Sequence, residues 1–215
     1  MIRIPVLEFG SNKYNKQVVN YLKSTHKCTI TTYDLFKNNL VKTMDIDQFD
    51  CLLIGGAKKT ISLRKLITLE KSTKNNPLQE AYAIIKRFWN KPILAYGYGC
   101  MLLGLYYKCD VVPLEEPNVN DHQHIIVDHR YKINKINKTE MGPDEITVTF
   151  NNRNTLHIPR DNFLVEPLMF RAKQRFDPCG FRFDAMHYGF IFRLIDSKYG
   201  KNIIENFFSI VGTSY

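Results

Sequence analysis

Apolar runs and helical periodicity alternate along the first half of the chain. Short apolar runs predict buried strands at residues 2–10, 28–34, 49–56 and 91–97. Apolar residues at helical spacing predict helices at residues 11–25, with Ser11 as N-cap, and at residues 78–90, and a further helix begins at Cys100. Strands that alternate with helices favour a parallel sheet covered on both faces.

The pattern changes in the middle of the chain. Residues 124–136, 145–152 and 154–159 are typical of antiparallel strands joined by polar turns. An apolar run at residues 186–195 predicts another buried strand, and residues 198–211 have the periodicity of an amphipathic helix. Repeats, low-complexity segments and linkers are not evident, so the sequence predicts a single domain over residues 1–215.

Length and composition narrow the class of protein. A chain of 215 residues can bury one sizeable core. It has no apolar run near the roughly 20 residues that span a bilayer, and its first residues lack the layout of a signal peptide. Five scattered cysteines without a C-x-x-C pair favour free thiols in a reducing compartment. We therefore expect a cytoplasmic protein with no cofactor and no membrane contact. The Lys- and Asn-rich composition is typical of AT-rich genomes such as those of large DNA viruses, for which virion or host cytoplasm is the alternative location.

Histidines and net charge bear on possible ligands. His122 and His124 share one face of a predicted strand but lack further ligands, so a polar strand edge is favoured over a metal site, and we expect no metal. The net charge of +9 attracts acidic partners, nucleic acid included. Because the basic residues are spread out rather than gathered in one motif, a solvated basic surface is favoured and nucleic-acid association is the alternative.

Four segments, taken together and in this order, resemble the class I glutamine amidotransferases, in the form seen in GMP synthetases. VLEFGSNKY (6–14) resembles the opening strand and turn of that family, and FDCLLIGGAKKT (49–60) resembles the segment whose amides help to form the oxyanion hole. KPILAYGYGCMLLG (91–104) resembles the nucleophile segment, and YGFIFRLIDSKYGKNIIENFF (188–208) resembles the segment with the catalytic His and Glu. The resemblance implies an α/β, three-layer flavodoxin-like fold with a mixed central sheet and a small antiparallel addition.

One residue at the turn in 91–104 decides between two functions. The strained turn of a nucleophile elbow needs small residues two positions before and two after its apex. Gly97 has Ala95 and Gly99 at those positions, whereas Cys100 has bulky residues on both sides. The sequence therefore predicts Gly97 at the apex, and the resemblance places Gly97 opposite the family's cysteine.

The resemblance also aligns Arg193 with the family's histidine and Ile195 with its glutamate. Arginine stays protonated and cannot act as a general base, and isoleucine cannot orient an imidazole. We therefore expect a pseudoenzyme: no catalytic residues, a structural or interaction role in a larger assembly, and protein partners. A vestigial pocket is expected at Gly55, Gly56, Tyr98 and Arg193.

An active amidotransferase or related hydrolase that uses Cys100 is the main alternative. A cysteine in the first turn of a helix has a lowered thiol pKa, and His187, His157 or His122 would have to approach it. The competing interpretation is an inert buried thiol.

Arg193 and two insertions also have two interpretations each. Arg193 could bind the carboxylate or phosphate of a metabolite, but an internal ion pair with Asp196 or Glu116 is favoured. Residues 57–77 and 137–152 would be recognition loops in an assembly, or simple solvated connections.

Overall fold

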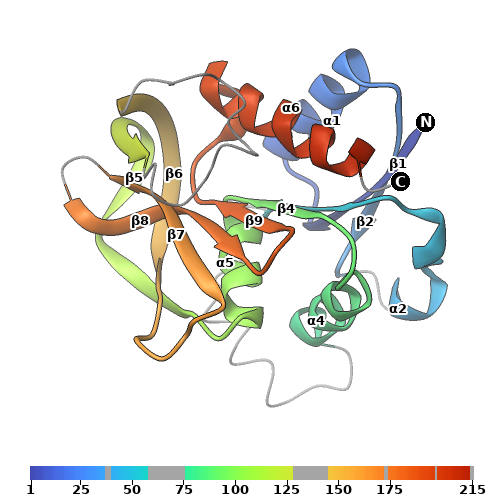
Figure 1. Cartoon of the computed structure of the whole chain (residues 1–215), viewed down its shortest axis with the longest axis horizontal. Helices are drawn as coiled ribbons and strands as arrows, with labels where there is room; N and C mark the ends of the chain where they lie inside the picture. The colour runs from blue at the N-terminus through green and yellow to red at the C-terminus, as the bar shows by residue number, and fades with distance from the viewer. Residues whose placement is uncertain (37–39, 58–75, 128–144, 172–173, 197, 214–215) are drawn as a thin grey trace. The chain divides into compact units, whose positions relative to one another are not determined.

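The computed structural model describes residues 1–36, 40–57, 76–127, 145–171, 174–196 and 198–213 (Figure 1). The chain divides into two compact units, unit 1 (Met1–Ile93) and unit 2 (Leu94–Tyr215). The single domain over residues 1–215 stays a prediction. Most of residues 57–77, the first of the two insertions, lie outside the described residues.

Parallel strands form the centre of unit 1. Strand β1 (Ile2–Phe9) pairs in parallel with β2 (Cys28–Asp34) on one side and with β3 (Leu52–Ala57) on the other. Ile4, Val6, Leu7 and Phe9 of β1 are fully buried, as expected for a central strand covered on both faces. The strands predicted in this half of the chain are confirmed.

The helices of unit 1 include α1 (Lys13–Thr25) after β1 and α4 (Pro77–Arg87) before β4 (Ile93–Tyr96), both confirmed with small shifts in their ends. The predicted cap Ser11 is wrong by one residue, because the Asn12 side chain accepts the hydrogen bond from the Asn15 amide at 2.8 Å. Serine and asparagine are equally good N-caps, so adjacent candidates cannot be separated by residue type. Two short helices, α2 (Leu40–Thr43) and η1 (Ile46–Gln48), were not predicted.

Antiparallel strands dominate unit 2. Its strand order is β9-β8-β7-β5-β6, with every described pairing antiparallel. The strands are β5 (Asp110–Val127), β6 (Glu145–His157), β7 (Val165–Arg171), β8 (Gln174–Phe183) and β9 (His187–Phe190). The edge of β9 adjoins β4 (Ile93–Tyr96), since the Gly97 amide that ends β4 donates to the Phe190 carbonyl at 2.8 Å.

This antiparallel part is larger than the sequence predicts. β5 begins at Asp110, well before the predicted residue 124, and residues 128–136 lie outside the described residues. The strands predicted at 145–152 and 154–159 are one strand, β6. β7 and β8 were not predicted, because register shifts between them break the alternation that marks a strand.

The core of unit 2 is rich in aromatic rings. Phe181 stacks on Phe183, with 5.6 Å between ring centroids, and Phe190 lies 5.5 Å from Phe192. Helix α5 (Tyr98–Tyr106) packs against β9, and α6 (Lys198–Thr213) closes the chain after the 3-10 turn η3 (Leu194–Asp196) (Figure 1). The apolar run predicted as a strand to residue 195 therefore ends as a strand at Phe190. None of the described helices is both long enough and apolar enough to cross a membrane.

Candidate functional site

The turn between β4 and α5 has an unusual backbone conformation. Gly97, at the N-cap of α5, has φ 55° and ψ −120°, a conformation that residues with a side chain rarely adopt. Its carbonyl accepts from the Cys100 amide at 3.1 Å, which fixes the first turn of the helix. A Cβ placed on Gly97 would meet no atom within 4 Å. The apex of the turn thus has no side chain and has room for one.

Cys100 lies one turn further on and faces the sheet. Its side chain is fully buried, and its Sγ lies 2.8 Å from where a Cβ on Gly189 would stand. Burial, together with the nearby Cys109 and Cys179, raises the pKa of the Cys100 thiol well above its usual range. The thiol therefore stays protonated at neutral pH and packs α5 onto β9.

Two of the histidines named with Cys100 have other polar partners, and the side chain of the third lies outside the described part of the chain. His187 is buried at the start of β9, where its Nδ1 is 2.5 Å from the Tyr107 hydroxyl at the far end of α5. His157 is exposed, and its Nδ1 lies 3.5 Å from Asp110 Oδ2. His122 is in β5, opposite Thr149, but its side chain is outside the described part of the chain.

Arg193 and Ile195 follow β9. The Arg193 Nε lies 3.0 Å from Asp196 Oδ2, and its amide donates to the Thr149 carbonyl at 2.9 Å. This ion pair with Asp196 is one of the two partners considered from the sequence, while the Glu116 side chain lies outside the described part of the chain. Ile195 is half-buried in η3.

Gly55 and Gly56 end β3 in unit 1 and lie against a buried amide that sequence reasoning missed. The Asn15 side chain accepts from the Gly56 amide at 2.9 Å and donates to the Gly56 carbonyl at 3.0 Å. It also donates to the buried Glu8 carboxylate at 3.0 Å. A Cβ on Gly55 would stand 2.8 Å from Asn15 Oδ1, so glycine lets helix α1 approach the strand. The sequence did contain one indication of this role, because Asn15 lies on the same apolar face of α1 as Val18 and Leu22.

The vestigial pocket predicted at four residues stays a prediction. Gly55 and Gly56 belong to unit 1, and Tyr98 and Arg193 belong to unit 2. Burial raises the pKa of the Tyr98 phenol at the start of α5, so this phenol stays protonated at neutral pH. Within the described ranges, no group of three or more His, Cys, Asp or Glu residues is placed to hold a metal ion.

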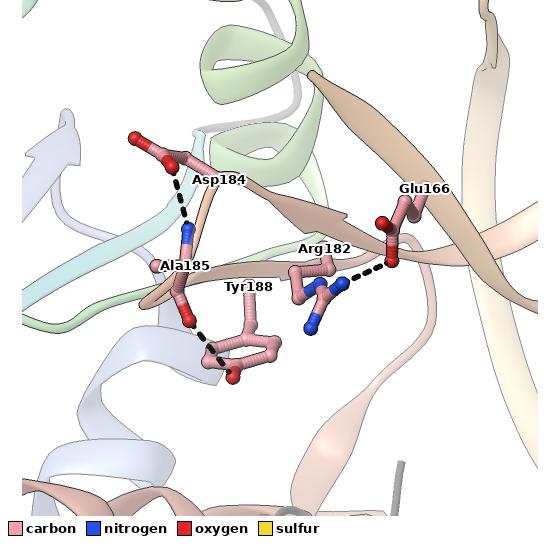
Figure 2. A network of polar contacts seen from close by, with 5 residues as sticks. All are labelled: Glu166, Arg182, Asp184, Ala185 and Tyr188. Carbon is pink, nitrogen blue, oxygen red and sulfur yellow. Dashed lines mark hydrogen bonds and ion pairs between the residues drawn. The ribbon is translucent and has the colours of Figure 1, made fainter. Parts of the chain in front are cut away.

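A second polar cluster, also missed from sequence, joins β7, β8 and β9. Arg182 forms an ion pair with Glu166 across the β7–β8 pairing, and the Tyr188 hydroxyl donates to the Ala185 carbonyl at 3.3 Å (Figure 2). In the turn from β8 to β9, Asp184 has φ 64° and its carboxylate accepts from the Ala185 amide at 2.7 Å. These contacts hold the β8–β9 hairpin together and join it to β7.

Comparison with solved structures identifies the fold. A chain from Thermoplasma acidophilum described as a GMP synthase subunit superposes with a TM-score of 0.74 at 20% identity, over 100% of this chain and 96% of that one. A glutamine amidotransferase from Thermotoga maritima gives 0.68 at 12% identity, over 99% of this chain and 85% of that one. This is the class I glutamine amidotransferase fold.

The amidotransferase fold extends over the whole chain, and a third structure, a glutamine amidotransferase from Methylobacillus flagellatus, agrees with a TM-score of 0.62 at 14% identity, over 98% of this chain and 76% of that one. The predicted fold class, α/β with a mixed sheet and an antiparallel addition, is therefore confirmed. No protein-family model matches the sequence, and no curated protein matches it. At these identities the likeness establishes the fold alone.

Proposed function

We propose that this chain is an amidotransferase-like module without glutaminase chemistry that serves an interaction role in a larger assembly. The observation that carries the proposal is the backbone of Gly97. Its φ of 55° marks the strained apex of a strand-to-helix turn, the position at which an elbow presents its nucleophile. In this chain the apex is glycine, which has no nucleophilic side chain.

The remaining chemistry supports the same conclusion. Release of ammonia from glutamine needs a thiolate, a base that handles its proton, and a group that orients the base. Arg193, which the sequence aligns with the base, is permanently charged and ion-paired with Asp196. Ile195 has no polar atom to orient an imidazole. Removing one member of such a unit already costs several orders of magnitude in rate.

Cys100 is a poor substitute nucleophile. Its thiol is fully buried against β9, and burial keeps it protonated. An attacking thiol must be a thiolate and must reach the substrate carbonyl. A fold that keeps its architecture without its chemistry is consistent with a surface role, because function lies in sites built on a fold rather than in the fold itself.

A glutaminase assay combined with covalent labelling tests the loss of chemistry. The purified chain is incubated with glutamine and ammonia is measured, and a parallel sample is treated with an electrophilic glutamine analogue and analysed by intact mass spectrometry. We expect ammonia at the level of the buffer blank and no added mass. Cys100→Ala is the matched control. Ammonia release by the wild type that disappears in this variant would show that the chain is an enzyme.

A further inference from the structure

Strand β2 of unit 1 stands at one end of the strand order and is paired along one edge. The order begins β2-β1-β3, so β1 is the one described strand that pairs with β2 (Figure 1). All seven residues of β2 have consecutive partners on β1, so the strand is regular and has no bulge. Among the described elements, β1 and α1 make the main contacts with it. The described part of the chain therefore leaves the second edge of β2 open.

The hydrogen bonds to β1 decide which backbone groups of β2 point to this open edge. The Ile2 amide donates to the Lys27 carbonyl at 3.2 Å, just before β2 begins. In a parallel pair every second residue directs its amide and carbonyl at the neighbouring strand. Counting on from Lys27, the amides and carbonyls of Ile30 and Thr32 point away from β1, and no described residue bonds to them.

The open edge lacks the features that usually protect one. Natural edge strands carry a lysine, a proline or a bulge, or are covered, because an open row of backbone groups pairs with other chains. CTITTYD, residues 28–34, contains neither lysine nor proline. At the other end of the strand order, β6 is interrupted: its pairing with β5 shifts register, and the Arg193 amide bonds to its Thr149 carbonyl at 2.9 Å. β2 is therefore suited to accept another strand.

We propose that this chain self-associates through β2, with two copies of the strand paired antiparallel about a two-fold axis at Thr31. In an antiparallel pair, residues whose backbone groups point to the shared edge must lie opposite one another. An axis at Thr31 meets this condition, because Ile30 of each copy then lies opposite Thr32 of the other and the two exchange hydrogen bonds. The same edge serves both copies, so the contact closes at a dimer.

The side chains of β2 suit a copy of the same strand. Between Cys28 and Tyr33 the strand has no charged residue, so antiparallel pairing brings no like charges together. Thr31 is exposed and would face Thr31 of the other copy on the axis. Threonine pairs across strands are favourable. A strand with a charge in this stretch would not match itself in this way.

The charges at the ends of β2 are complementary in the same register. Cys28 lies opposite Asp34 of the other copy, and its thiol donates to the Leu22 carbonyl of α1 at 3.6 Å. Burial raises the pKa of this thiol and the Lys23 ammonium lowers it, which places Lys23 near Cys28. Lys23 is exposed and has no ion pair with a described residue. Asp34 Oδ1 accepts from two backbone amides, but its Oδ2 has no described partner. Each Lys23 can therefore face an Asp34 of the other copy.

Sedimentation velocity on the full chain, over a wide range of concentrations, tests the proposal. We expect a monomer–dimer equilibrium in the wild type. Thr32→Pro removes an amide that no described residue uses, and proline is tolerated at such edge positions. Its dissociation constant should rise about a hundredfold, because each dimer loses two donors and each loss costs about tenfold. Thr32→Ala keeps the amide and is the matched control, with an expected change within about threefold.

A charge exchange on the axis tests the register. Thr31→Lys and Thr31→Glu each place two like charges opposite one another, so each should raise the dissociation constant about fivefold. A mixture of the two variants should form mixed dimers that are tighter than either variant alone. Asn20→Lys adds the same charge at an exposed position of α1 and should leave the equilibrium unchanged. Circular dichroism checks that every variant remains folded.

Three results would each overturn the proposal: a wild type that is monomeric throughout, dimers that tolerate Thr32→Pro, or mixed dimers no tighter than those of the single Thr31 variants. The proposal rests on the interaction role proposed above but not on the loss of chemistry. Ammonia release measured on the same samples tests that loss separately.

Discussion

At position 97, backbone stability favours glycine, whereas catalysis by an elbow requires a residue with a nucleophilic side chain. A residue with a side chain at φ 55° and ψ −120° carries backbone strain of about 1–3 kcal/mol. Enzymes with a nucleophile elbow tolerate this strain because the turn exposes the nucleophile to the substrate. Glycine adopts this conformation without that strain. In a chain that does not need the nucleophile, glycine at the apex is the more stable residue, so the proposed loss of chemistry would bring a gain in stability at the same position.

Replacing Gly97 by cysteine tests this argument. We expect Gly97→Cys to lower the free energy of unfolding by about 1–3 kcal/mol, measured by urea denaturation. The introduced thiol should react quickly with iodoacetamide in the native state, because a Cβ there meets no atom within 4 Å. Cys100 of the wild type, which is fully buried, should stay unlabelled over the same time. Equal stability of the two proteins, or an unreactive introduced thiol, would contradict the geometry of the turn.

The Asn15 amide is the corresponding residue in unit 1. Asn15→Ala removes the partner of the buried Glu8 carboxylate and of both polar groups of Gly56. Leaving buried polar groups unpaired should lower the free energy of unfolding by about 1–3 kcal/mol in urea denaturation. Asn20→Ala, at an exposed position of the same helix, is the control and should change stability by less than about 0.5 kcal/mol. Equal effects of the two substitutions would rule out a structural role for the Asn15 network.

The structural role of a residue can be predicted from sequence when its partners are close along the chain. The turn between β4 and α5 could be predicted because small residues within two positions of the apex carry the signal. The role of Asn15 could not, because its partners Glu8 and Gly56 lie 7 and 41 residues away along the chain. The Arg193–Asp196 ion pair spans only three residues, and it could be named in advance as one of two alternatives.

Among the elements, regular periodicity separates those that were predicted from those that were not. α1 and α4 each show a clear helical period and the parallel strands are short apolar runs, so these elements were predicted to within a few residues. The pairing of β5 with β6 shifts register after Pro113 and after Val119. β7 and β8 have similar shifts. A bulge is invisible in a single sequence because it is defined by the partner strand.

Helix α6 offers a matched pair of glycines. A Cβ on Gly200, near its start, would stand 2.0 Å from the backbone carbonyl oxygen of Leu194, whereas a Cβ on Gly212, near its end, would meet nothing within 4 Å. Gly200→Ala should therefore lower the free energy of unfolding by about 3 kcal/mol through overpacking. Gly212→Ala should raise it by up to about 0.5 kcal/mol through helix propensity. Thermal and urea unfolding of both variants measure the difference, and a tolerated Gly200→Ala would mean that η3 does not pack on α6 as described.

Across the whole molecule, burial of thiols sets the response to alkaline pH. The thiols of Cys51, Cys100, Cys109 and Cys179 are buried, and burial is the largest cause that raises their pKa above the usual value of 9.0. Below pH 9 the folded and unfolded chains both keep these protons, so the thiols do not affect stability. Above pH 9 the unfolded chain releases protons that the folded chain retains. The unfolded state then binds fewer protons, and stability falls as pH rises.

Urea denaturation between pH 7 and pH 10 should therefore show a stable plateau followed by a decline that begins near pH 9. Each fully protected thiol adds about 1.4 kcal/mol per pH unit to this decline. Cys179→Ala removes one such thiol, so its curve should fall less steeply above pH 9 than that of the wild type, whatever its stability at pH 7. Cys28→Ala alters a half-buried thiol and should flatten the curve less. Parallel curves for the wild type and Cys179→Ala would mean that this thiol ionises as easily in the folded chain as in the unfolded one, which a fully buried side chain of β8 cannot do.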